Sequence, residues 1–244
     1  MELIKIYYII IYMSDKINNW YNDIDKEFTR KPKLDKTYNN HYINPCSHVC
    51  LIGQTGSGKS CALLDFLNRK QDSFYKIILF TGSTDDEPLY NFLKSKIPEM
   101  ETYTDINELP SLTDFDDDEK EQEKLIIFDD FTDLKNKEMV KINEYLKSGR
   151  KMGFNCWVLA QNYVSIPKNI TRNCQYFIIF KQNDNTTINN IIRNHNTDNI
   201  DKEIFKNAYE YATKEPRNFL MIDTTSGAGI KKLRHNFKNF LRTK

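Results

Sequence analysis

The sequence lacks the features of a disulfide-bonded, membrane-spanning or strongly charged protein. Its five cysteines are an odd number and form no C-x-x-C pair, which argues against a disulfide framework or a zinc site and favours a reducing compartment. The net charge is only +1, so the field of the whole molecule does not draw it to nucleic acid or to an acidic membrane surface. Any contact with DNA therefore has to come from local patches.

Long apolar runs are missing as well. The run at the N-terminus, Ile6–Met13, has about eight residues, which is too short to span a bilayer, and no small-residue cleavage site follows it. We interpret it as an extra strand, or as a leader upstream of a true start at Met13. We expect no membrane partner.

Glycine is scarce, with eight in 244 residues, yet three glycines fall within six positions of residues 53–58. The stretch Gly53 to Ser60 reads GQTGSGKS and fills the pattern G-x-x-x-x-G-K-[ST] of a phosphate-binding loop. Such glycines let the backbone form a nest of N–H groups, and the following helix adds the positive end of its dipole. Lys59 is expected to reach the β- and γ-phosphates of ATP, and the Ser60 hydroxyl to hold Mg²⁺. The predicted nucleotide-binding residues are Gly53, Gln54, Thr55, Gly56, Ser57, Gly58, Lys59, Ser60 and Cys61.

Short apolar runs alternate with helical stretches from about residue 46 onward. The alternation predicts an α/β fold with a mostly parallel central sheet, flanked by helices joined through right-handed crossovers. The expected strands are His48–Ile52, Lys76–Thr81, Lys124–Asp129, Cys156–Ala160, Tyr176–Phe180 and Asn218–Ile222. The expected helices are Lys59–Lys70, Pro88–Ile97, Lys137–Met152, Thr186–His195 and Lys202–Thr213.

Three domains or segments are expected: an N-terminal extension or lid at 1–45, a P-loop ATPase domain at 46–225 and a basic C-terminal tail at 226–244. The stretch from residue 230 onward has six Lys or Arg and no acid. It is interpreted either as a solvated terminal helix or as a strand followed by a nucleic-acid contact. The acidic stretch Asp114–Lys124 is interpreted as a solvated loop, and Cys50, Cys156 and Cys174 as small core residues.

Polar side chains follow two of the expected strands. KLIIFDD places Asp129 and Asp130 where an apolar strand ends, and Gln161 follows the next one. Asp129 is expected to order the Mg²⁺ shell, and Asp130 to act as the general base or to orient the attacking water. With the phosphate loop and Asp129 at the tips of neighbouring strands, Gln161 would lie at the mouth of the same crevice and contact the γ-phosphate or the water.

Four segments carry a resemblance to a known family: GQTGSGKS, LIIFDD, SGRKMGFNCWVLAQNY and SIPKNITRNCQYFIIFK. In this order and spacing they resemble the poxvirus-type genome-packaging ATPases of the FtsK–HerA superfamily, over about residues 46 to 225. The resemblance implies a P-loop NTPase fold of the RecA-like, additional-strand type. By this resemblance, Lys59 and Ser60 match the phosphate-loop residues, Asp129 matches the acidic residue that orders Mg²⁺, and Asp130 matches the catalytic acidic residue. Gln161 matches the sensor residue, which responds to the γ-phosphate. Superfamily members often have Glu where this chain has Asp130.

The same resemblance implies a ring, commonly a hexamer, that uses ATP to thread double-stranded DNA into a preformed capsid. The expected partners are duplex DNA, bound without sequence preference, and a capsid or vertex protein. The expected location is the host cytoplasm or a viral factory, with association with the virion as a further expectation. Loops Asn162–Lys168 and Asn183–Asn190 are candidates for a central pore.

Ring motors usually complete the site with a cation from the adjacent subunit. The chain has eight arginines, and Arg150 is favoured for this role, closely followed by Arg172, with Arg193 as a further candidate. Two other functions stay open. One is a P-loop kinase for a small molecule, which would need an Arg-rich lid that the sequence lacks, and the other is a nucleotide-dependent assembly switch that moves no DNA.

Overall fold

The structure is a computed structural model, and it describes residues 19–25, 32–34, 36–70, 73–82, 88–116, 120–196, 200–226 and 232–242. The chain divides into two compact units, Met1–Arg30 and Lys31–Lys244. Within the described part of the first unit, η1 (Trp20–Asn22) is a single 3-10 turn. The apolar run Ile6–Met13 lies outside the described residues.

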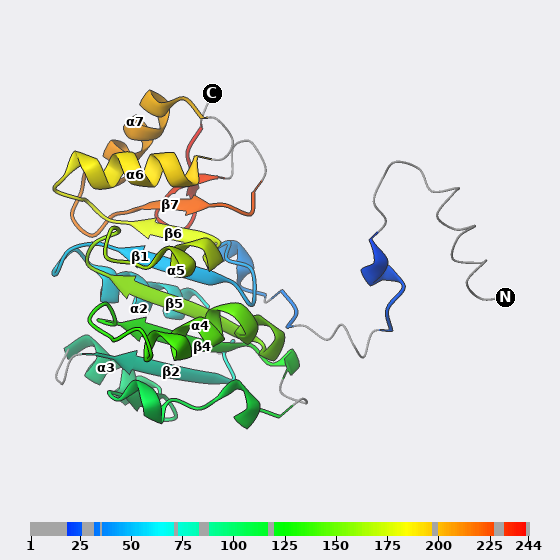
Figure 1. Cartoon of the computed structure of the whole chain (residues 1–244). Helices are drawn as coiled ribbons and strands as arrows, with labels where there is room; N and C mark the ends of the chain where they lie inside the picture. Colours follow the sequence, from blue (N-terminus) through cyan, green and yellow to red (C-terminus); the bar gives the residue numbers. More distant parts are fainter. Residues whose placement is uncertain are drawn as a thin grey trace. The chain divides into compact units, whose positions relative to one another are not determined.

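The second unit is built on a nine-stranded sheet with helices on both faces (Figure 1). The strand order is β3-β2-β4-β5-β1-β6-β7-β8-β9. The strands are β1 (His48–Ile52), β2 (Lys76–Thr81), β3 (Glu101–Tyr103), β4 (Lys124–Asp129), β5 (Phe154–Ala160), β6 (Tyr176–Ile179), β7 (Leu220–Asp223), β8 (Leu233–His235) and β9 (Asn239–Phe240). The helices are α2 (Lys59–Arg69), α3 (Pro88–Lys96), α4 (Met139–Ser148), α5 (Lys168–Asn173), α6 (Asn185–His195) and α7 (Lys202–Ala212). Short 3-10 turns are η3 (Tyr38–Asn40), η4 (Ile106–Glu108), η5 (Leu112–Asp114) and η7 (Gly149–Met152).

The central strands are apolar along their whole length because both faces of the sheet are covered. Successive side chains of a strand point to opposite faces. In β1, Cys50 and Ile52 join a core shared with α4, α5, α6 and α7, whereas Val49 and Leu51 join a core shared with α2 and α3. This arrangement explains why these strands read as continuous apolar runs instead of alternating patterns.

All six expected strands and all five expected helices are present, with ends shifted by a few residues. The helix expected at Lys137–Met152 is shorter, because α4 ends at Ser148 and the chain continues as the 3-10 turn η7 up to Gly153. The sequence did not reveal β3, β9 or α5, and it indicated β8 only as a strand that was one of two alternatives for the C-terminal segment. Each has at most six residues, so none carries enough periodicity to be recognised.

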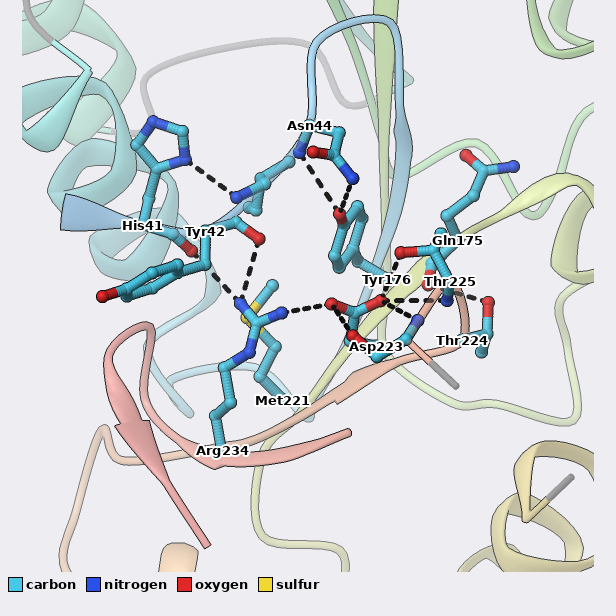
Figure 2. A network of polar contacts seen from close by, with 12 residues as sticks. His41, Tyr42, Asn44, Gln175, Tyr176, Met221, Asp223, Thr224, Thr225 and Arg234 are labelled. Atoms are coloured by element: carbon cyan, nitrogen blue, oxygen red, sulfur yellow. Dashed lines mark hydrogen bonds and ion pairs between the residues drawn. The ribbon is translucent and has the colours of Figure 1, made fainter. Parts of the chain in front are cut away.

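The last three strands are antiparallel, and a buried ion pair holds them to the segment that precedes β1 (Figure 2). Arg234 in β8 pairs with Asp223 in β7, and both side chains are almost fully buried. The Arg234 guanidinium also donates to the carbonyl oxygens of His41 and Tyr42, at 3.3 and 3.1 Å. Burial lowers the pKa of Arg234, and the charge of Asp223 opposes that shift.

This network corrects one interpretation of the C-terminal segment. Residues 233–240, assigned by sequence to a basic tail, form two strands that extend the sheet, so the solvated helix is wrong. Arg234 is a buried structural cation, whereas Arg242 is exposed.

The acidic stretch Asp114–Lys124 is also only partly a solvated loop. Its residues 117–119 lie outside the described ranges, but Phe115, Glu123 and Lys124 are buried. Glu123 accepts hydrogen bonds from Lys70 at 2.8 Å and from Asn155 at 2.7 Å. The stretch therefore ends in a buried ion pair. The expected core cysteines Cys50, Cys156 and Cys174 are buried, as predicted. Among the described residues, no helix is long and apolar enough to cross a membrane.

Candidate active site

The phosphate loop connects β1 to α2 and is anchored by backbone hydrogen bonds. The Gly53 N–H donates to the Ala160 carbonyl at 3.1 Å, and the Ser57 N–H donates to the Gln54 carbonyl at 3.0 Å. Gly58 is the N-cap of α2 and has φ 109°, a conformation that glycine adopts without a steric penalty. The loop thus delivers the chain to the N-terminus of α2, and its residues Thr55, Gly56 and Gly58 border a cavity.

Lys59 holds its ammonium group over this loop. Its Nζ donates to the carbonyl oxygen of Gly53 at 2.7 Å and to that of Gln54 at 3.3 Å. The positive charge of the lysine therefore stays beside the amide nest and adds to the dipole of α2. Both features favour a bound anion at this point.

One cavity of about 380 Å³ brings the predicted residues together, and its size is within the range of small-molecule sites. It is bordered by the phosphate loop, the ends of β4 and β5, α3 and the segment before β7. Its lining residues are Thr55, Gly56, Gly58, Lys59, Ser60, Cys61, Leu89, Asp129, Asp130, Thr132, Leu159, Ala160, Gln161 and Arg217. Of the predicted loop residues, Gly53, Gln54 and Ser57 are not in this lining, although the first two supply the carbonyl groups that hold Lys59.

Asp129 is the last residue of β4, and its surroundings shift the pKa of its carboxyl group. Its Oδ2 accepts a hydrogen bond from the Tyr90 hydroxyl at 2.6 Å. Burial raises the pKa of Asp129 above its usual range, while the Tyr90 hydrogen bond and the charge of Lys59 act in the opposite direction. Tyr90, on α3, was not predicted from the sequence, because its contact depends on the packing of α3 against the sheet.

Asp130 is exposed and adopts φ 51°, which is uncommon for a residue other than glycine. Its N–H donates to Asp129 Oδ1 at 3.0 Å, so the Asp129 carboxylate is held against the backbone of Asp130. Gly82, at the end of β2, packs against this backbone so closely that a Cβ atom there would lie 2.0 Å from the Asp130 carbonyl oxygen. The backbone that carries Asp130 is therefore fixed by a close approach that only glycine permits.

Gln161 directly follows β5, and the sheet order corrects one expectation about it. The phosphate loop and Asp129 are not at the tips of neighbouring strands, because β5 lies between β1 and β4. The inserted strand places Gln161 between the phosphate loop and the carboxylate pair, at the carboxyl edge of the sheet. The expected crevice is present, and Gln161 lies at its centre.

The arginines proposed to act from a neighbouring subunit lie elsewhere on their own chain. Arg150 is in η7, just before β5, and therefore at the amino edge of the sheet, opposite the phosphate loop. Its charge, together with the larger effect of burial, lowers the pKa of His48, the first residue of β1, to about 4. Arg172 and Arg193 line a second cavity of about 650 Å³, together with Lys168.

Arg217 lines the nucleotide cavity, and sequence reasoning missed it. It lies 157 positions after Ser60 and belongs to no pattern near the phosphate loop. Only the antiparallel pairing of β7 with β6 brings it to this edge of the sheet. No local signal in the sequence could have identified it.

The loop, the inserted strand and the carboxylates at the end of β4 define the fold class as a P-loop NTPase of the additional-strand type. Within that class, the chain belongs to the family described as Poxvirus A32 protein, whose model matches residues 35–227.

Solved structures agree on the fold. The DNA-packaging ATPase from Sulfolobus turreted icosahedral virus is similar with a TM-score of 0.53 and 17% identity, over 75% of this chain and 95% of that one. The genome packaging NTPase from Sulfolobus turreted icosahedral virus 2, in complex with ATP-gammaS, gives a TM-score of 0.55 and 18% identity, over 76% and 96%. Among curated proteins, none matches this chain.

Proposed function

We propose that the protein is an ATPase that packages double-stranded viral DNA into a preformed capsid. One observation carries the proposal: Lys59, Ser60, Asp129, Asp130 and Gln161 come from three different parts of the chain and line a single cavity. Family membership and the fold shared with viral packaging enzymes support the same function.

In this proposal the chain binds the triphosphate through backbone amides and the lysine. The loop N–H groups and the N-terminus of α2 hold the α- and β-phosphates, and Lys59 moves from the loop carbonyls to the β- and γ-phosphates. The Ser60 hydroxyl and the Asp129 carboxylate are hard oxygen donors of two residues that line the same cavity, which fits Mg²⁺. When bound, Mg²⁺ would neutralise charge on the phosphates.

The hydrolytic step is assigned to the two exposed polar residues beside Asp129. Asp130 accepts the proton of the attacking water, and its position is fixed by Gly82. Gln161 hydrogen-bonds the same water or the γ-phosphate. Because Gln161 begins the segment that leads to α5, loss of the γ-phosphate can be passed to residues 162–168.

The partners of this proposal are duplex DNA, further copies of the chain in a ring, for which we favour a hexamer, and a capsid or vertex protein. The cavity beside α5 and α6 is suited to a DNA phosphate, since Lys168, Arg172 and Arg193 line it and none of its described lining residues is acidic. It lies beside the Asn162–Lys168 loop, one of the two candidate pore loops.

Arg150 and Arg172 remain the candidates for the cation supplied to a neighbouring site. The domain limits 1–45, 46–225 and 226–244, and the location in the host cytoplasm or a viral factory, belong to the same proposal.

The deciding experiment is the steady-state ATPase rate with and without linear duplex DNA. The motor predicts turnover that duplex stimulates and that added salt weakens, because the enzyme contacts phosphates and not base edges. Lys59→Ala should remove nucleotide binding or turnover while the fold stays intact. Full hydrolysis by Lys59→Ala would refute the phosphate-loop assignment, phosphate on a small acceptor would establish a kinase, and binding without turnover would indicate an assembly switch.

A further inference from the structure

The nucleotide cavity contains a second cation from the same chain, Arg217, whose role the proposed mechanism leaves open. Its side chain is exposed, and it forms no hydrogen bond or ion pair with any residue that the structure describes. An arginine beside a phosphate-binding loop, with its donors unused, is matched to an anionic ligand, because the planar guanidinium binds phosphate oxygens with two parallel hydrogen bonds.

The backbone of Arg217 is held in a conformation that its side chain does not favour. Its φ is 66°, and it is one of five residues other than glycine with positive φ in the described part of the chain. Asp130, across the same cavity, is another. Residues in such conformations persist where the surrounding structure fixes them, and they concentrate at functional sites. The conformation is thus a reason to look for a function at Arg217.

A set of hydrogen bonds fixes the segment that carries Arg217. The Asn218 N–H donates to the Glu215 carbonyl at 3.2 Å, and the Asn218 side chain accepts from Asn236 Nδ2 at 3.0 Å. Asn236 also accepts from the Phe219 N–H at 3.1 Å, which ties the segment to the turn between β8 and β9. These contacts hold Arg217 against the phosphate loop: a Cβ atom on Gly58 would lie 3.2 Å from the Cβ and Cγ atoms of Arg217.

The order of the strands determines which end of the nucleotide Arg217 meets. β4 and β5, which carry Asp129 and Gln161, lie on one side of β1, whereas β6 and β7 lie on the other. Arg217 precedes β7 at the carboxyl end of β6, since Leu220 pairs with Ile179. The phosphate loop therefore lies between the carboxylate pair and Arg217, and the two charges border opposite sides of one site.

We propose that Arg217 binds the α-phosphate of the nucleotide held by its own subunit. This inference rests on the proposed nucleotide site, but not on DNA translocation. Lys59, Ser60 and Asp129 account for the β- and γ-phosphates and the metal on the β4 side. The cation on the far side of Gly58 then faces the phosphate nearest the nucleoside. Arg217 is a ligand-positioning residue that acts within one chain, unlike the cation expected from a neighbour.

The test is the dissociation constant of Arg217→Ala for ADP and for ATP-gammaS, measured by calorimetry. A charge-assisted contact to the α-phosphate predicts that both affinities fall by the same factor, roughly ten- to hundredfold. The matched control is Lys214→Ala, an exposed cation of the same segment that does not line the nucleotide cavity, and it should bind both ligands normally. An unchanged affinity of Arg217→Ala for ADP would overturn the proposal, and a loss confined to ATP-gammaS would move the contact to the γ-phosphate.

Two further variants separate this inference from its alternatives. Arg217→Gly removes the cation but accepts the positive φ, so it should lose nucleotide affinity with a melting temperature no lower than that of the wild type. A parallel drop in melting temperature and affinity for this variant would mean that Arg217 is structural. Lys59→Ala distinguishes the two proposals, because normal ADP binding together with full hydrolysis by that variant would refute the phosphate loop itself. Loss of binding in Lys59→Ala with normal binding in Arg217→Ala would refute only the role of Arg217.

Discussion

Replacing Arg234 by methionine tests whether the basic C-terminal segment is part of the fold or a surface for DNA. The side chains of Arg234 and Asp223 are 2% and 6% exposed, so Arg234→Met leaves a buried carboxylate without its counter-charge. Removing one partner of a buried pair costs about 3–5 kcal/mol. Asp223 keeps hydrogen bonds from Thr225 and Ser226, which points to the lower end of that range.

A loss of about 3 kcal/mol corresponds to a fall in melting temperature of roughly 6–12 °C for a domain of this size. It should appear as an earlier urea midpoint with an unchanged m-value. The double variant Asp223→Leu/Arg234→Met should recover part of the loss, because it removes both charges. Recovery stays partial because the carbonyl groups of His41 and Tyr42 lose their donor.

The control is Arg242→Met, which removes an exposed arginine of the same segment. It should leave the melting temperature within about 2 °C, since surface substitutions rarely exceed about 0.5 kcal/mol. A contribution of Arg234 to DNA binding would instead lower the salt slope of DNA affinity by about one, with unchanged stability. That result for Arg234→Met would refute the conclusion that Arg234 stabilises the fold through its ion pair with Asp223.

Three further predictions concern the nucleotide site. Gly82→Ala places a methyl group against the Asp130 carbonyl, so hydrolysis should slow by about 100-fold while ADP affinity is retained, and normal turnover would refute the fixed geometry. Burial raises the pKa of Asp129, and metal binding needs the ionised carboxylate, so activity should be lost on acidification at a higher pH than for an ordinary aspartate. Tyr90→Phe removes a hydrogen bond that lowers this pKa, so it should move the loss of activity to still higher pH. An unchanged pH profile for Tyr90→Phe would contradict this prediction. Mixing Asp130→Asn with Arg150→Ala should restore ATPase activity if Arg150 acts across a subunit boundary, whereas no recovery at any ratio counts against that role.

The parts of the site that could be predicted from sequence are those whose chemistry is local. Gly58, Lys59 and Ser60 form a contiguous motif, and Asp129 ends an apolar strand, so residue type and position were enough to place them in one crevice. Arg217 and Tyr90 could not be found in this way. Their positions depend on how elements distant in sequence pack together, and the sequence pattern around each residue does not indicate that packing.

The same distinction applies to the fold. β1, β4 and β5 are apolar on both faces, and this composition identified them as central strands. β8 contains a buried arginine, and in sequence it resembles a solvated basic segment. Its burial depends on Asp223, which lies eleven positions earlier and on another strand. A hydropathy pattern does not indicate which residues form an ion pair between two strands.

The two outermost strands of the sheet have consequences for how copies of this chain meet. In the described part of the chain β3 has three residues and β9 has two, so each border of this sheet offers only a few free main-chain groups to a neighbour. Short borders of this kind resist the endless strand-to-strand growth that leads to fibres. In the proposed ring, contacts between copies would then be made by side chains, which can separate and reform at each turnover without any main-chain pairing having to break.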